Sequence, residues 1–325
     1  MGKKNIAVVA GGDSSEFAVS LKSAEGIFSF LDKEKYNVFV ALLSKKEWKV
    51  KIDETKFSPI DKNDFSFNRN GEKIKFDFAY ITIHGTPGEN GLLQGYFELI
   101  GMPYSSCDVL ASALTFDKYT CNHYLQAFGL KIAQSIRLRP EETPDNNSIV
   151  NAVGLPCFVK PNAGGSSVAT TKVKTADQLS QAIQDARNEG GEVIIESFMQ
   201  GREVTCGCYK TRKGCTVLPI TEAVSKNEFF DYEAKYTASK VEEITPAPIP
   251  ENIAEEIRQS TARIYDILKC KGIIRVDYII VGETPFLLEV NTTPGMTSTS
   301  FIPQQVRAAG LSMQDVLTDI IENEF

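Results

Sequence analysis

Several features that would assign this chain to a particular class of protein are absent from its sequence. The seven cysteines are irregularly spaced and form no Cys-x-x-Cys pair, which excludes a zinc ribbon and suggests no disulfide framework. No apolar run is long enough for a membrane span, and the start MGKKNI fits neither a signal peptide nor a myristoylation site. We therefore expect reduced cysteines in a cytoplasmic protein.

Positive charge is also in deficit, and the common phosphate-binding motif is missing. The 35 Lys and Arg residues against 42 Asp and Glu give a net charge of −7, which argues against nucleic acid or a membrane surface as partner. No GxxxxGK[ST] segment occurs, which excludes an ordinary P-loop. The length of 325 residues and the 42% hydrophobic content are those of a globular protein with two or three domains.

The first third of the chain has the pattern of an open, parallel α/β domain. A buried strand at 5–12 runs into glycines, and we expect Ser14 or Ser15 to cap the following helix, with Glu16 in its first turn. Apolar residues then recur at helical spacing, and two further strands follow at 37–43 and 76–83.

The remaining two thirds predict a second, mixed arrangement. Its expected elements are a helix at 113–130, a linker at 139–147, strands at 156–160, 192–198, 204–209 and 215–220, and helices at 175–188 and 249–269. The polar stretch 226–243 has no clear period and predicts a long loop, which in a compact domain is usually a functional lid or disordered.

A hairpin at 272–291 carries the most informative polar residues. With its turn centred on Glu283, Asp277 lies opposite Glu289 and Arg275 opposite Asn291, all on one face. Facing carboxylates repel, so the pattern indicates a hard cation such as Mg²⁺ between them. The alternative is a solvated face on which Arg275 pairs with Asp277, and a slip of one residue would invalidate the predicted site.

A cation held by few carboxylates usually shares its coordination shell with phosphates, so a phosphate site is expected nearby. Lys160 at a strand end, followed by the Gly-rich loop 162–167, can turn backbone N–H groups toward an anion. A plain hairpin turn is the alternative interpretation of that loop. Lys118 is a second candidate cation, although a lone helical lysine is usually solvated.

Motifs along nearly the whole chain resemble those of the D-alanine–D-alanine ligase family, which has the ATP-grasp fold. The matching segments are GGDSSEFAVS, HGTPGENG, EVIIESFMQGREVT, DYEAKY, RVD and LLEVNTTPGMTSTS. The chain departs from the family pattern at Asn90, where Asp is usual, and at Phe17-Ala18, where Arg-Glu is usual. These departures concern the first-substrate pocket and not the reaction.

The resemblance implies an α/β ATP-grasp fold of three domains, with the nucleotide bound between two α+β domains. The implied limits are 1–105 for the N-terminal domain with the first-substrate site, 106–196 for the central subdomain, and 197–325 for the C-terminal domain with the lid 226–243. The implied reaction joins two D-alanine molecules through an acyl phosphate, using ATP and two Mg²⁺ ions, which Mn²⁺ could replace, for peptidoglycan precursor synthesis.

The resemblance also assigns roles to individual residues. Asp277, Glu289 and Asn291 would hold the metal; Lys118, Lys160 and Lys235 would surround the phosphates; and Glu196, the backbone of Ser197 and Met199, and Glu203 would bind the adenosine. Arg275 and the Gly295 N–H would form the oxyanion hole, Glu16 and His84 the first-substrate pocket, and Ser300 and the Phe301 backbone the second-substrate carboxylate site. Ser166 and Tyr236 would link with Glu16 to fasten the lid.

Two other functions remain open at this level. A ligase of the same fold could use D-lactate or D-serine as its second substrate, and Tyr236 favours D-alanine because lactate-using relatives differ in the lid. A nucleotide-binding regulatory protein without catalysis is the other alternative, and the presence of all the metal and lysine positions argues against it. The family suggests a homodimer.

Overall fold

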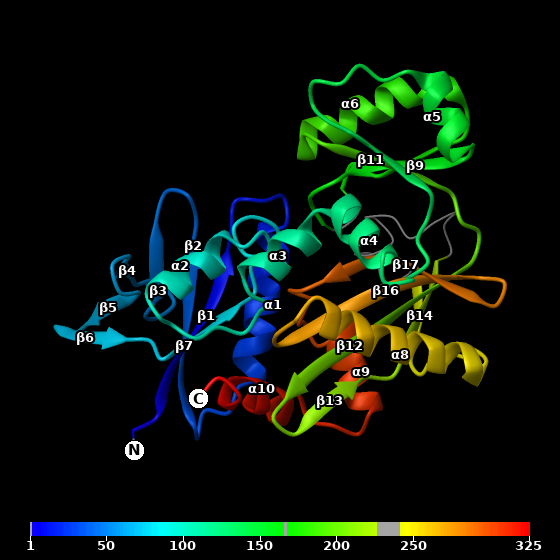
Figure 1. The fold of residues 1–325 in the computed structure, drawn as a ribbon. Helices are drawn as coiled ribbons and strands as arrows, with labels where there is room; N and C mark the ends of the chain where they lie inside the picture. Colours follow the sequence, from blue (N-terminus) through cyan, green and yellow to red (C-terminus); the bar gives the residue numbers. More distant parts are fainter. Residues whose placement is uncertain (1, 166–167, 226–240) are drawn as a thin grey trace.

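A computed structural model describes residues 2–165, 168–225 and 241–325, and three sheets follow one another along that part of the chain (Figure 1). The first sheet lies to the left in Figure 1, the second at the top, and the third at the centre and lower right. This arrangement agrees with the expected α/β ATP-grasp architecture.

The first sheet is parallel only in its central strands. β1 pairs in parallel with β2 and β7, and the rest of the sheet is a series of antiparallel pairs. The spatial order is β6 (Glu72–Lys75), β5 (Ser66–Arg69), β4 (Phe57–Asp61), β3 (Trp48–Lys51), β2 (Tyr36–Leu43), β1 (Lys4–Gly11) and β7 (Phe78–Ile81). The antiparallel extension was not predicted from the sequence, although Asn70-Gly71 between β5 and β6 is a strong hairpin signal.

Helix α1 (Phe17–Phe30) begins later than expected. Its N-cap is Glu16, which makes no side-chain capping hydrogen bond, so the predicted position of Glu16 in the first turn is wrong. The Ser14 hydroxyl instead accepts from the Glu16 N–H at 3.3 Å and donates to the carbonyl of His84 at 2.8 Å. The start of α1 is therefore tied to the loop that follows β7.

The helix predicted at 113–130 is two helices, α3 (Val109–Phe116) and α4 (Lys118–Gln126). Asp117 between them is extended, forms a β-bridge with Ala163, and accepts from the Thr120 N–H at 2.8 Å. The break comes from this long-range pairing, and it places Lys118 at the first position of α4. Helix α2 (Leu92–Leu99) precedes this pair.

The second sheet is antiparallel and has its own core. Its order is β10 (Thr171–Val173), β9 (Cys157–Pro161), β11 (Val193–Ser197) and β8 (Ser135–Leu138). It packs against α5 (Asn146–Val153) and α6 (Leu179–Gly190), and the short 3₁₀ helix η1 (Ala176–Gln178) contacts both helices. Apolar residues of both helices and the sheet form one buried cluster.

The third sheet runs in the order β15 (Val241–Ile244), β14 (Thr221–Ser225), β12 (Arg202–Thr211), β16 (Ile273–Val281) and β17 (Thr284–Asn291), with β13 (Gly214–Val217) paired to β12. Helix α8 (Glu251–Ile267) packs against it through a second buried cluster. The predicted loop 226–243 is too long, because residues 241–243 belong to β15 and pair with β14. Residues 226–240 lie outside the described part.

The last two helices, α9 (Phe301–Ala308) and α10 (Met313–Glu322), join the first and third sheets (Figure 1). Their apolar residues share one buried cluster with β1, α1, Tyr209 and Ile273. The first and third sheets are therefore connected by continuous apolar packing. Among the helices of the described ranges, none is long and apolar enough to cross a membrane.

Candidate active site

A cavity of about 1590 Å³ lies where the three sheets meet. This exceeds the roughly 300–1,000 Å³ of an ordinary small-ligand pocket, so it has room for more than one ligand. It is lined by the N-cap of α1, the loop after β7, the start of α4, β9, β11, β12, the β16–β17 hairpin and the start of α9. Every predicted site residue in the described part of the chain lines this cavity.

The predicted pairing across the β16–β17 hairpin is confirmed, although the turn differs from the predicted one and a register shift restores the pairing. Asp277 lies opposite Glu289 and Arg275 opposite Asn291. The turn contains Gly282 and Glu283, with Val281 opposite Thr284, and is not centred on Glu283. If that register continued without interruption, Leu288 would lie opposite Asp277, and the Glu289 side chain would point to the other face.

A β-bulge near Leu288 restores the register that the site needs. The side-chain amide of Asn122 on α4 donates to the Leu288 carbonyl at 3.0 Å. The Leu287 N–H donates to the carbonyl of Lys131 at 2.8 Å. Contacts from the α4 region therefore accompany the bulge that turns the Glu289 carboxylate into the cavity.

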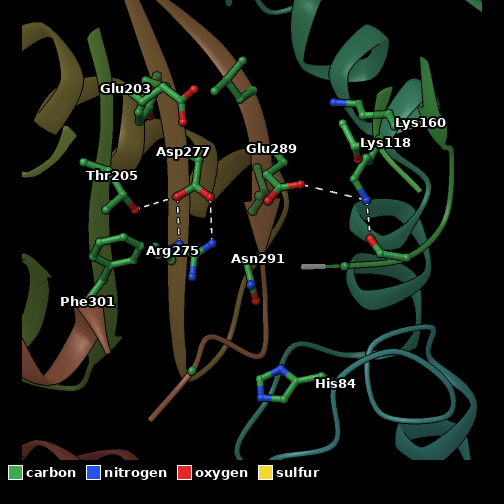
Figure 2. Close-up of a pocket in the computed structure, with 18 of the residues that line it drawn as sticks. His84, Lys118, Lys160, Glu203, Thr205, Arg275, Asp277, Glu289, Asn291 and Phe301 are labelled. Atoms are coloured by element: carbon green, nitrogen blue, oxygen red, sulfur yellow. Dashed lines mark hydrogen bonds and ion pairs between the residues drawn. The ribbon is translucent and has the colours of Figure 1, made fainter. Parts of the chain in front are cut away.

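Arg275 and Asp277 form a bidentate ion pair on β16, and Figure 2 shows it at the centre of the cavity wall. The guanidinium Nε and Nη2 lie 2.8 and 2.7 Å from the carboxylate oxygens, and the Thr205 hydroxyl donates to the same carboxylate at 2.6 Å. Burial lowers the pKa of Arg275, but the charge and hydrogen bonds of Asp277 outweigh it and raise that pKa.

The Arg275–Asp277 pair is the contact expected if the hairpin face were simply solvated. The two side chains are, however, only 13% and 18% exposed and line a cavity, so the solvated-face interpretation fails. Glu289 extends toward Lys118, with the Nζ 3.9 Å from its carboxylate (Figure 2). The Lys118 ammonium also donates to the carbonyl of Gly164, which places the lysine against the predicted phosphate loop.

The opposite wall carries Lys160 on β9 and Glu196 on β11. The Lys160 ammonium lies 2.6 Å from the Glu196 carboxylate, and both side chains are largely buried. Burial lowers the pKa of Lys160, but the charges of Glu196 and Glu289 outweigh it and raise that pKa. Glu203 on β12 lies above Asp277 in Figure 2, and Ser197 and Met199 also line the cavity.

The predicted first-substrate residues also converge. Glu16 is buried beside the Gly-rich loop, and a Cβ at Gly165 would lie 2.5 Å from its carboxylate, so a larger residue there would displace the Glu16 side chain. His84 is buried, with its Nε2 3.1 Å from the Ser23 hydroxyl. Burial, aided by the charge of Arg275, lowers the pKa of His84 to about 4, so the ring is neutral at pH 7.

The loop after β17 carries the predicted second-substrate groups. A Cβ at Gly295 would lie 3.0 Å from the Ser300 hydroxyl, which also accepts from the Thr297 N–H at 3.1 Å. Phe301 begins α9, and its ring lies 5.5 Å from the Arg275 guanidinium. The Gly295 and Ser300 groups therefore lie next to each other, at the end of the cavity that holds Arg275.

Several polar residues of the cavity were not predicted from the sequence, among them Thr205 and Glu89. Thr205 shares a face with Glu203 on β12, so period-two alternation could have identified it. Glu89 closes its own loop by accepting from the Gly85 N–H at 2.6 Å, and it lines the cavity. Burial, followed by the charge of Glu16, raises the pKa of Glu89 to about 8.

Three predicted residues, Ser166, Lys235 and Tyr236, lie outside the described residues. Within the described ranges, no group of three or more His, Cys, Asp or Glu side chains could hold a metal ion alone. Two carboxylates and an amide, Asp277, Glu289 and Asn291, nevertheless fit a hard cation that completes its coordination shell with phosphate oxygens. The oxygen-only donor set fits Mg²⁺ better than a soft metal.

Comparison with known proteins places these features in one family. Residues 5–107 match the family model described as D-ala D-ala ligase N-terminus, and residues 124–322 match D-ala D-ala ligase C-terminus. The chain is 60% identical over 324 residues to a D-alanine–D-alanine ligase of Phocaeicola vulgatus, covering 99% of this chain and 100% of the relative.

Solved structures agree with this similarity. The fold is similar to that of the VanG D-Ala:D-Ser ligase from Enterococcus faecalis, with a TM-score of 0.86, 30% identity and complete coverage of both chains. It is also similar to a D-alanine–D-alanine ligase from Bacillus anthracis complexed with ATP, with a TM-score of 0.79, 30% identity and coverage of 100% of this chain and 97% of that one.

Proposed function

The chain belongs to the D-alanine–D-alanine ligase family, and we propose that it joins two D-alanine molecules to D-alanyl-D-alanine at the expense of ATP. One observation carries the proposal beyond family membership. A single cavity brings the carboxylates Asp277 and Glu289 together with the ammonium groups of Lys118 and Lys160. This combination suits a triphosphate with its counter-ions, next to a pocket for small zwitterions.

In the first step, a carboxylate oxygen of one D-alanine attacks the γ-phosphorus of ATP, and ADP leaves. Glu16 receives the ammonium group of that D-alanine, and the neutral His84 lines its pocket. Lys118 and Lys160 place positive charge beside the phosphates, which stabilises charge that develops during the transfer. Glu196 and Glu203, with the backbone of Ser197 and Met199, orient the adenosine.

In the second step, the amine of another D-alanine attacks the acyl-phosphate carbonyl. The new C–N bond forms, the C–O bond to phosphate breaks, and inorganic phosphate and a proton are released. Arg275 and the Gly295 N–H stabilise the oxyanion of the tetrahedral intermediate. Ser300 and the Phe301 N–H bind the carboxylate of the attacking D-alanine. Ser166, Lys235 and Tyr236 are assigned to the lid and the phosphates by the resemblance alone.

Asp277, Glu289 and Asn291 would hold two Mg²⁺ ions, or Mn²⁺ in their place. When bound, the metal neutralises phosphate charge and polarises the γ-phosphoryl group. The Arg275–Asp277 contact holds that carboxylate in place through two hydrogen bonds and leaves Glu289 directed at Lys118. The chain itself thus orients the donor oxygens that the cation would use.

The choice of D-alanine as second substrate rests on sequence similarity. The curated relatives named as D-alanine–D-alanine ligases reach 62% identity, whereas the D-Ala:D-Ser ligase and the D-alanine–D-alanine ligase from Bacillus anthracis are each 30% identical. The test is phosphate release from ATP with D-alanine alone, then with D-lactate or D-serine added, with the product identified by mass. D-alanyl-D-alanine as the main product near neutral pH supports the proposal. If the main product were the depsipeptide, the protein would instead be a ligase that uses D-lactate.

We also propose the wider setting of this reaction. The product would enter peptidoglycan precursor synthesis in the cytoplasm, where ATP is available, and the active form would be a homodimer. The three domains 1–105, 106–196 and 197–325 each contain one of the three sheets to within one residue, which supports that division. Sedimentation of the purified protein tests the dimer.

A further inference from the structure

Glu243 on β15 is an acidic side chain of the cavity to which no role has yet been assigned. It lies opposite Ala223 on β14, which in turn lies opposite Glu203 on β12, so the three residues form one row across the sheet. All three line the cavity. The neighbouring Glu242 pairs with Val224 and points to the other face of β15, away from the cavity lining.

A hydrogen bond from Gln304 connects Glu243 to the start of α9. The Gln304 side-chain amide donates to the Glu243 carboxylate and also to the carbonyl of Thr299 at 2.7 Å. The Gln304 N–H donates to the Ser300 carbonyl at 3.2 Å, so Gln304 lies one helical turn from Ser300 and Phe301. The Glu243 carboxylate is therefore one side chain away from the proposed carboxylate site of the second substrate.

Among residues 2–165, 168–225 and 241–325, no lysine or arginine forms an ion pair with Glu243. Arg275 is engaged by Asp277, and Arg307 donates to the Ser298 carbonyl at 3.0 Å. Burial raises the pKa of Glu243, and the Gln304 hydrogen bond and the charge of Arg275 oppose that rise. A dipolar hydrogen bond from Gln304 holds the carboxylate without cancelling its charge.

We propose that Glu243 is a specificity-determining residue, whose negative charge favours a second substrate that carries an ammonium group over a hydroxy acid that does not. This inference rests on the proposed ligase function. D-Alanine arrives as a zwitterion with no net charge, whereas D-lactate arrives as an anion. A fixed carboxylate near their shared carboxylate site repels the anion, and attraction for the ammonium group offsets that repulsion for the amino acid.

The magnitude follows from Coulomb's law. Removing one unit charge in the partly solvated mouth of the cavity should change the relative kcat/KM of the two substrates by about threefold to tenfold. Salt screens such an interaction, so the discrimination should weaken as ionic strength rises. A purely structural role for Glu243 would change the total rate but not the ratio of products.

The experiment is a competition between D-alanine and D-lactate for the second site, with ATP and Mg²⁺, in which both products are quantified by mass spectrometry. Glu243→Gln keeps an acceptor for Gln304 but removes the charge, and it should raise the depsipeptide-to-dipeptide ratio about threefold to tenfold. Glu243→Asp, which keeps the charge, should stay near the unmodified ratio. Glu242→Gln removes the same charge from the other face and is the matched control.

The unmodified protein supplies an independent measurement. Raising KCl from about 0.05 to about 0.5 M should increase its depsipeptide share, and the same change should have a smaller effect on Glu243→Gln. An unchanged product ratio in Glu243→Gln, or an equal shift in Glu242→Gln, would overturn the inference while leaving the ligase function intact. Absence of D-alanyl-D-alanine from the unmodified protein would instead overturn the proposed function and this inference with it.

Discussion

The two walls of the cavity hold their charges in different ways. On the β16–β17 wall, strand register places Asp277 opposite Glu289, and Arg275 neutralises one of the two acids from the same strand. On the β9–β11 wall, Lys160 is paired with Glu196 from the adjacent strand at 2.6 Å. The ion pair between Lys118 and Glu289 is longer, at 3.9 Å.

The two walls also rest on different cores. The β9–β11 wall has a buried cluster built from its own sheet and helices. The β16–β17 wall shares its packing with α8 on one side, and through α9 and α10 with the first sheet on the other. Each wall can therefore keep its charges in place independently, and a ligand that carries both phosphates and a cation can contact both walls.

The largest expected effect comes from a substitution in the β16–β17 wall. Glu289→Gln should reduce ATP turnover by about two to four orders of magnitude, because the lost charge acts where the phosphates are neutralised. The measurement is steady-state phosphate release at ordinary Mg²⁺, with circular dichroism to verify the fold. Glu283→Gln, in the exposed turn of the same hairpin, is the matched control. Near-normal turnover in Glu289→Gln would remove this residue from the metal site.

Loss of the lysine from the β9–β11 wall should weaken nucleotide binding. Lys160→Met should weaken ATP binding by about tenfold to a hundredfold, since one buried cation beside the phosphates is lost and Glu196 is left without its partner. Calorimetric titration with a non-hydrolysable ATP analogue measures this directly. If Lys160→Met together with Glu196→Gln restored full affinity, Lys160 would serve only to neutralise Glu196.

Arg275, on the β16–β17 wall, should affect catalysis more than nucleotide binding. Arg275→Lys should lower kcat by about tenfold or more, because the fixed fork that pairs with Asp277 and faces the oxyanion is lost. The KM for ATP should change little. Initial rates with ATP and D-alanine varied separately resolve the two parameters, and a large loss of ATP affinity at constant kcat would assign Arg275 to the nucleotide instead.

The separate cores predict different responses to cavity-creating substitutions. Ile183→Ala lies in the core of the second sheet, and Ile27→Ala lies in the core that the first sheet shares with α9 and α10. Each should lower the unfolding free energy of its own core by about 2–5 kcal/mol. Hydrogen exchange should rise within 135–197 for Ile183→Ala, and in both the first sheet and α9–α10 for Ile27→Ala. Identical exchange patterns in the two variants would show that the protein unfolds as one unit.

The smallest effect is expected at a departure from the family pattern. The Asn90 amide donates to the Thr86 hydroxyl at 3.0 Å, and Asn90 is not part of the cavity lining. Asn90→Asp, which restores the usual family residue, should change the KM for D-alanine by less than about twofold, since a hydroxyl can donate to a carboxylate in the same place. Substrate titration of both forms checks this.

Local patterns predicted the pairing of Asp277 with Glu289, yet for an incomplete reason. Alternation in β16 and β17 places the acids on one face, but the tight turn alone would have put Glu289 on the other. The bulge near Leu288 corrects this, and it is accompanied by contacts from Asn122 and Lys131, which are far away in sequence. Contacts of that range cannot be predicted from period-two patterns.

The missed elements have the same kind of cause. The break at Asp117 depends on a bridge to Ala163, so the helical period of 113–130 gave no sign of it. Strand β15 pairs with β14, which the polar composition of 241–243 concealed. The hairpin at Asn70-Gly71, by contrast, was predictable from its dipeptide. Most of the site could be assigned because the family motifs name residues directly, without needing the fold.

Formation of an acyl phosphate can be detected through the transfer of an oxygen atom from D-alanine to phosphate. D-Alanine labelled with ¹⁸O in its carboxylate is incubated with ATP, Mg²⁺ and the protein, and the inorganic phosphate is examined by mass spectrometry. The account predicts that each phosphate carries one ¹⁸O atom from the attacking carboxylate and that the nucleotide product is ADP. Unlabelled phosphate, or release of AMP and pyrophosphate, would contradict it.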